Sequence, residues 1–236
     1  MKKNKIVLLC FFIGIFIFSG CSNKGLDEKE VSKVFIEDFI YHKETEKFKE
    51  NFVEGDILSK QLTIMTTGVE DTFSGVFDPI TGALSEKEKK QISDGLMKKV
   101  RETSSYKYKV KEGKKNQIEV TYQIKGFDYP HLVEQTLDGV LGELMKETDM
   151  KASTSKQMIL HSFSDALSKG KESKKSTEVT IKFEKVKKQW QIVEGQDDKL
   201  ELILLAFISG YNNKSNYEKE MNTMLESSIN NAKSKL

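Results

Sequence analysis

Hydrophobic residues in the first part of the chain recur every three or four positions, the period of an amphipathic α-helix. This spacing predicts one long helix over residues 27–52 and a second helix capped by Asp56. Ser85 and Glu88 form a capping-box pattern that predicts the start of a third helix, and residues 75–82 are expected to form the loop before it. The hydrophobic positions that support these helices are Val31, Val34, Phe35, Phe39, Phe48 and Phe52; Leu58, Leu62, Met65, Val69 and Phe73; and Ile92, Leu96 and Val100.

From residue 106 the hydrophobic period changes to two. Residues 106–111 and 118–125 alternate on either side of Gly113 and predict one β-hairpin, and residues 179–184 and 190–193 predict a second. Alternation of this kind is typical of an antiparallel sheet with one buried face and one face in water. The positions expected to face the core are Tyr106, Tyr108, Val110, Ile118, Val120, Tyr122, Ile124, Val179, Ile181 and Phe183.

Helical spacing returns between the two hairpins and again after the second one. Pro130 suits the start of one inserted helix, and Gly170 is expected to end the next. Asp198 and Glu201 predict the start of a helix that Gly210 ends, and one more helix follows it. The pattern therefore predicts an α+β fold. N-terminal helices pack on one face of a roughly four-stranded antiparallel sheet, a helical insert separates the hairpins, and helices close the C-terminus.

The N-terminus has the pattern of a signal peptide. Lys2, Lys3 and Lys5 precede an apolar run over residues 6–18, which falls short of the ~20 residues that span a bilayer. We therefore expect residues 1–20 to be a cleaved signal peptide, with a short N-terminal anchor helix as the alternative.

The apolar run ends in Phe18-Ser19-Gly20-Cys21, which resembles the lipobox of bacterial lipoproteins, with Phe18 in place of the usual leucine. The resemblance implies cleavage between Gly20 and Cys21 and a diacylglycerol group on the Cys21 thiol. An ordinary secretory cleavage that leaves Cys21 free is the alternative. Two acyl chains give a stable anchor where a single chain binds reversibly.

The anchor predicts a simple domain organisation. Residues 21–26 would be the lipidated cysteine and a short tether, and residues 27–236 a single extracytoplasmic α+β domain. A tether of about six residues reaches at most ~20 Å when extended. We therefore expect the domain to lie close to the outer face of the cytoplasmic membrane.

Charge and composition exclude several classes of function. The chain has 38 basic and 36 acidic residues, and loss of the three signal-peptide lysines makes the remainder nearly neutral. Arg101 is the only arginine, whereas nucleic-acid recognition usually depends on arginine. No cysteine follows Cys21, which excludes a disulfide or a cysteine metal site in the mature chain. We expect no nucleic-acid partner, no metal and no cofactor beyond the covalent diacylglycerol.

The order of elements and the segment Val179-x-Ile-x-Phe183…Trp190-x-Ile-Val193 look like the cystatin-like or nuclear-transport-factor-2-like folds. Lipoproteins of low-GC Gram-positive bacteria use domains of this kind. The resemblance implies helices that close one face of a curved sheet into a cone. The helical insert departs from the compact form of these folds, and no functional residue of either family has a counterpart here.

Motifs for catalysis are weak. The three histidines lack the spacing of a zinc site. Two Ser-x-x-Lys matches, at Ser104 and Ser153, have no companion Lys-Thr-Gly motif and are expected by chance in a chain rich in both residues. We therefore expect a non-enzymatic interaction or binding module, whose partners are the bilayer and an unknown protein or cell-envelope component.

Two groups of residues are candidate sites. Lys107, Lys109 and Lys111 share the polar side of one strand, within a segment that has eleven basic and four acidic residues between positions 87 and 115. They are predicted either to bind an anionic surface or to protect an edge strand from aggregation. The second group consists of Tyr106, Tyr108, Tyr122 and Trp190. The alternative function is a small-ligand carrier or enzyme that uses a cone-shaped cavity between sheet and helices. In that case these aromatic residues would line the cavity; otherwise they belong to the core.

Overall fold

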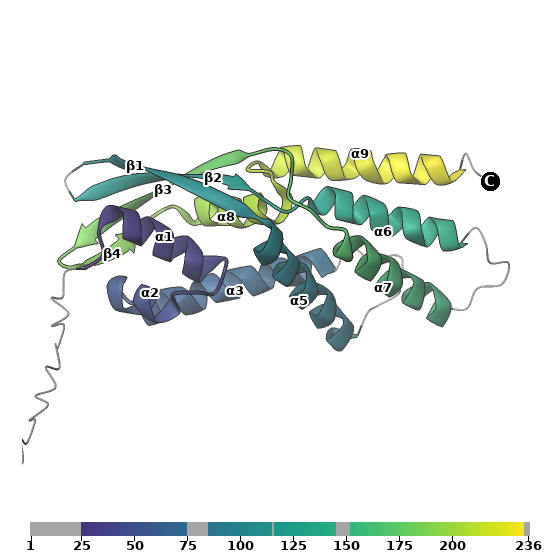
Figure 1. Cartoon of the computed structure of the whole chain (residues 1–236), viewed down its shortest axis with the longest axis horizontal. Helices are drawn as coiled ribbons and strands as arrows, with labels where there is room; N and C mark the ends of the chain where they lie inside the picture. The colour runs from purple at the N-terminus through teal and green to yellow at the C-terminus, as the bar shows by residue number, and fades with distance from the viewer. Residues whose placement is uncertain (1–24, 75–84, 115, 145–151, 234–236) are drawn as a thin grey trace, which may run out of the picture.

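The computed structural model describes residues 25–74, 85–114, 116–144 and 152–233. Within these ranges the predicted α+β fold is confirmed: helices cover one face of an antiparallel sheet, and two helices lie between its hairpins (Figure 1). The predicted signal peptide, the lipobox with Gly20 and Cys21, and the loop at residues 75–82 lie outside the described residues.

The sheet is a meander of four strands in the order β1-β2-β3-β4. Its strands are β1 (Ser105–Glu112), β2 (Gln117–Lys125), β3 (Thr177–Val186) and β4 (Gln189–Ile192). The alternation read from the sequence matches the two faces. Val120 stands between Val110 and Ile181 on the buried face. On the other face Glu119 pairs with Lys182 at 3.0 Å.

Helices α1 (Glu28–Phe39) and α8 (Asp197–Ser209) contact the buried face of the sheet (Figure 1). Asp27 and Glu30 form a capping box that starts α1. Helix α8 begins at Asp197, and its N-cap is Gln196, two residues before the predicted cap Asp198, which lies in the first turn. Gly210 ends α8 with φ of 74°, as predicted, because glycine adopts this left-handed conformation without a steric penalty.

The prediction of one helix over residues 27–52 is wrong. Helix α1 stops at Ile40, and α2 (Thr45–Asn51) starts after a turn in which His42 and Glu44 have positive φ. The turn brings the rings of Phe35 and Phe52 to 6.5 Å, both fully buried. In a straight helix these residues would stand ~25 Å apart. Hydrophobic packing therefore favours a helical hairpin over a continuous helix.

Helix α3 (Gly55–Ser74) follows, and it begins one residue before the predicted cap, Asp56. Helix α5 (Glu86–Thr103) starts at the predicted capping box of Ser85 and Glu88. Its predicted apolar positions are buried and belong to the same hydrophobic cluster as the inner face of the sheet. The predicted start and core face of this helix are confirmed.

The insert between β2 and β3 consists of α6 (Tyr129–Leu144) and α7 (Ala152–Ser168). These helices contact each other, and α6 also contacts the C-terminal helix α9 (Lys214–Lys233). Figure 1 shows this helical group at one end of the molecule. The β1–β2 and β3–β4 turns and the start of α1 lie at the opposite end.

Candidate functional site

The first described residues are held against strand β4. The Trp190 indole Nε1 donates a hydrogen bond to the Leu26 carbonyl at 2.9 Å, and the Leu26 amide donates to Oδ1 of Asn51 at 3.4 Å. Leu26 is buried. A Cβ at Gly25 would lie 1.9 Å from the carbonyl oxygen of Lys188, so only glycine permits this approach. The chain that follows the lipobox therefore joins the domain beside the β3–β4 turn.

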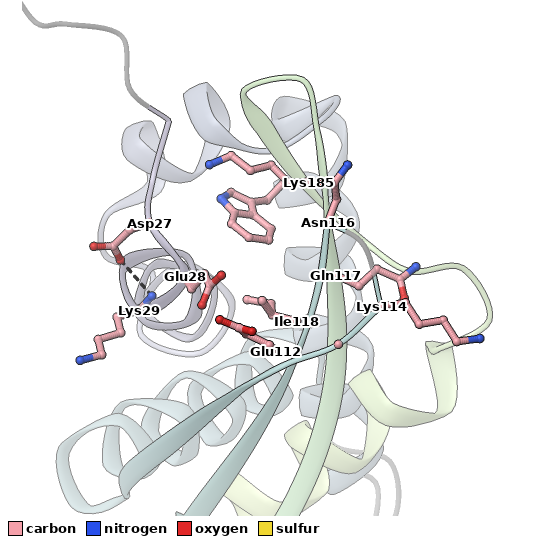
Figure 2. A pocket seen from close by; sticks show the side chains of 11 residues that line it. Asp27, Glu28, Lys29, Glu112, Lys114, Asn116, Gln117, Ile118 and Lys185 are labelled. Carbon is pink, nitrogen blue, oxygen red and sulfur yellow. Dashed lines mark hydrogen bonds between the residues drawn. The ribbon is translucent and has the colours of Figure 1, made fainter.

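A cleft with a volume of about 770 Å³ opens next to this junction (Figure 2). The start of α1 forms one wall, and the β1–β2 turn and the end of β3 form the others. Trp190 and Ile118 supply its apolar surface. The charged residues that line it are Asp27, Glu28, Lys29, Glu112, Lys114 and Lys185.

Several of these charged groups are engaged within the protein. The Asp27 carboxylate accepts hydrogen bonds from the backbone amides of Lys29 and Glu30 at 2.9 and 2.8 Å. The Lys185 ammonium lies 5.2 Å from the ring centre of Trp190, in cation–π contact. The cleft thus offers mixed charge above an aromatic and aliphatic floor. In the described part of the chain no cluster of three or more histidine, cysteine or acidic residues could hold a metal ion.

The three tyrosines predicted to line a pocket are packed together beneath α1. The ring centres of Tyr106 and Tyr108 each lie 6.3 Å from that of Tyr122, which has no solvent exposure. Tyr122 also packs against Phe35 of α1, and Tyr106 packs against Phe207 of α8. The rings therefore fill the layer between sheet and helices. Of the four aromatics proposed as pocket lining, the cleft in Figure 2 includes Trp190.

The hydroxyl groups of these tyrosines connect the sheet to α1. Tyr122 donates to the Ser32 carbonyl at 2.7 Å, and Tyr106 donates to the Glu37 carboxylate at 2.9 Å. Burial, with the Glu37 hydrogen bond as a second cause, raises the pKa of the Tyr106 phenol above its usual value. The phenol consequently stays a neutral donor to a higher pH than an exposed tyrosine would.

The structure places Lys107, Lys109 and Lys111 together on the polar face of β1, all exposed. Strand β1 is an edge of the sheet. The neighbouring carboxylate of Glu119 pairs with Lys182, and this pair and the charge of Lys111 lower the pKa of Glu119. The arrangement agrees with protection of an edge strand, and binding of an anionic surface by these lysines stays a prediction.

Sequence reasoning missed a different group of lysines. Lys114 lies in the β1–β2 turn, and Lys187 and Lys188 form the β3–β4 turn. In an antiparallel meander the first and third turns lie at the same end of the sheet, so these lysines and Gly25 share one end of the molecule (Figure 1). The sequence predicted the two hairpins separately, and the pairing of β2 with β3 that brings their turns to one end was not part of that prediction.

No helix in the described ranges is long and apolar enough to cross a membrane.

Comparison with known proteins supplies one similar fold. A solved structure described as a "putative lipoprotein (ycdA)" from Bacillus subtilis subsp. subtilis str. 168 superposes with a TM-score of 0.57 at 15% sequence identity. The alignment covers 80% of this chain and 58% of that one, so this chain spans less than two thirds of that protein. Among curated proteins there is no significant match. The domain family described as a domain of unknown function, DUF5105, matches residues 19–208, and the chain belongs to this family.

Proposed function

We propose that the protein is a lipoprotein on the outer face of the cytoplasmic membrane of a Gram-positive bacterium, anchored by diacylglycerol on Cys21. The lipobox supports the anchor, as does the likeness to a chain described as a lipoprotein. The observation that carries the proposal is the fixed position of Gly25 and Leu26 beside β4, four residues after Cys21. Four extended residues reach ~14 Å, so the anchor would hold this end of the domain at the bilayer.

At the membrane the domain acts as a non-enzymatic interaction module for a protein or another cell-envelope component. The packed tyrosine layer supports this reading over an enzyme with a deep cone-shaped cavity, because the rings occupy the space that a ligand would need. We propose in addition that the domain is a divergent cystatin-like fold. Its support is a helix, α1, across a four-stranded meander in the order β1-β2-β3-β4.

Replacing the anchoring cysteine tests the proposal directly. Cys21→Ala should abolish labelling by a fatty-acid analogue and release the protein to the medium or leave it as an uncleaved precursor. Cys10→Ala is the matched control, because it removes the only other thiol and should keep both label and membrane retention. Label that persists on Cys21→Ala would refute the anchor.

A small-ligand carrier is the second candidate, and the cleft beside Trp190 favours it. Carboxylates and ammonium groups surround the apolar floor formed by Trp190 and Ile118, a combination suited to a small zwitterion. Titration with each free amino acid, followed by the emission of Trp190, tests this function. A saturable change that Ile118→Asp abolishes would favour the carrier, and unchanged emission throughout would favour the interaction module.

A further inference from the structure

The end of the sheet next to the tether carries basic turns. Lys187 and Lys188 occupy the β3–β4 turn, and Lys114 occupies the β1–β2 turn; all three are exposed. Among the described residues none of the three has a carboxylate within ion-pair distance. We call these three residues the turn lysines. Lys114 also lines the cleft (Figure 2).

An exposed hydrophobic side chain accompanies the turn lysines. Val186 precedes Lys187 at the tip of the β3–β4 hairpin and is 39% exposed, one of three large hydrophobic residues so exposed in the described chain. Gly25, the first described residue after Cys21, lies against the backbone of Lys188. Basic and apolar groups thus project from the point where the anchored segment enters the domain.

Acidic residues also lie at this end, and two of them are engaged within the protein. The carboxylate of Asp27 caps α1, and that of Glu30 pairs with a lysine of α2 at 3.4 Å. Glu28 and Glu112 line the cleft (Figure 2), and Glu50 lines a depression that it shares with the β3–β4 turn. Glu28, Glu112 and Glu50 also have no ion pair in the described chain, so the turn lysines are distinguished by their place in the two turns at the end where Gly25 lies.

We propose that the turn lysines contact anionic lipid headgroups of the bilayer that holds the Cys21 lipid. This contact sets the orientation of the domain: the sheet end lies on the membrane, and α6, α7 and α9 point away from it (Figure 1). The inference rests on the proposed lipid anchor. The anchor makes the contact intramolecular, so individually weak lysine–headgroup attractions suffice to select one orientation. The inference assigns the contact with anionic lipid to the turn lysines and not to the strand face that carries Lys107 and Lys109.

Energy transfer from the single tryptophan tests the orientation. Trp190 lies at the sheet end, and no other tryptophan occurs in the chain. The lipidated protein is reconstituted in phosphatidylcholine vesicles with or without phosphatidylglycerol, each with a trace of headgroup-dansylated lipid. We expect more transfer from Trp190 with phosphatidylglycerol at ~0.01 M salt. The difference should shrink at ~0.15 M, as the Debye length falls from ~30 Å to ~8 Å.

Matched charge-reversal variants locate the contact. Exchange of Lys114, Lys187 and Lys188 for Glu should remove the dependence on phosphatidylglycerol. The same exchange at Lys107, Lys109 and Lys111 changes the net charge equally and should leave most of it. Lys187 has φ of 57°, a conformation that asparagine tolerates, so a milder variant with Lys187→Asn, Lys114→Gln and Lys188→Gln guards against misfolding. Equal transfer in both vesicle types, or loss only in the strand variant, would overturn the inference.

Flotation with neutral vesicles separates this inference from the anchor. A protein that floats with phosphatidylcholine vesicles but shows no effect of phosphatidylglycerol refutes the turn contact and leaves the anchor intact. A protein that does not float, with an intact mass that lacks diacylglycerol, refutes the anchor itself. Binding of a soluble glycerol-phosphate polymer through the turn lysines, together with equal transfer in both vesicle types, would assign the turns to wall polymer and refute the lipid contact.

Discussion

At the scale of a single residue, Gly126 allows the backbone to pass close to α8 between the sheet and the helical insert. It follows β2 where the backbone passes the end of α8, and the Ser173 amide donates to its carbonyl at 2.7 Å. A Cβ on Gly126 would lie 1.9 Å from the carbonyl oxygen of Ala206. The three atoms that such a Cβ would meet, in Ala206, Phe207 and Gly210, all belong to the backbone and cannot rotate away as a flexible side chain would.

We expect Gly126→Ala to destabilise the domain by about 1–3 kcal/mol or more, because the backbone of α8 must shift to admit the methyl group. Gly142→Ala is the control. Gly142 lies in α6, and a Cβ there would meet no atom within 4 Å. Its replacement by alanine should therefore stabilise the domain by about 0.5–1 kcal/mol, because alanine has the higher helix propensity. Urea unfolding followed by circular dichroism measures both changes. Equal midpoints for the two variants would contradict the close approach.

At the scale of secondary-structure elements, an ion pair joins two helices that are distant in the chain. Glu88 at the start of α5 pairs with Lys156 of α7 at 2.6 Å, and both side chains are largely covered. The Lys156 contact, with hydrogen bonds from Ser85 as the second cause, lowers the pKa of Glu88 from 4.5 to about 2. A carboxyl whose pKa is lowered by folding stabilises the native state above its unfolded pKa.

Stability from Glu88 is therefore complete at neutral pH and should be lost as the pH falls through 4.5 toward 2. Glu88→Gln keeps an acceptor for the capping box but cannot titrate. Its urea midpoint should decline less than that of the wild type between about pH 5 and about pH 2.5. Glu86→Gln is the control, because Glu86 lies in the same first turn, two residues before Glu88, and is far more exposed. Its decline should follow that of the wild type. Parallel declines for all three proteins would contradict the role of the ion pair.

The arrangement of the whole molecule separates a sheet end from a helical end. The turns, the cleft and the start of α1 lie together, and α6, α7 and α9 extend in the opposite direction (Figure 1). If the sheet end faces the bilayer, the helical end is free to meet a protein or wall component beyond the membrane surface. The two ends would then serve attachment and interaction separately.

Spin labels at the two ends test this separation. The mature chain has no cysteine beyond the lipidated one, so a new cysteine is labelled selectively. A label at Val186→Cys in the β3–β4 hairpin should lose accessibility to a water-soluble relaxation agent on anionic vesicles. A label at Asn222→Cys, exposed on α9, should remain accessible. Protection of Asn222→Cys, with Val186→Cys still accessible, would place the molecule in the opposite orientation.

Local features of the sequence determined much of this fold and little of its candidate site. The alternation in four strands, the capping box of Ser85 and Glu88 and the helix end at Gly210 depend on neighbours within a few residues, and all were predicted correctly. The break between α1 and α2 could not be read in this way. Its cause is the contact between Phe35 and Phe52, which forms only when the chain reverses.

The lipobox is a local signal, so the sequence by itself predicts Cys21 as the anchor. The surroundings of that anchor were decided by tertiary structure. Trp190 holds the Leu26 carbonyl across 164 positions of the chain, and the turn lysines come from turns more than seventy positions apart. Periodicity assigns a side chain to a face of its own strand or helix. It carries no information about which distant turns share one end of the molecule, because strand pairing and helix packing determine that proximity.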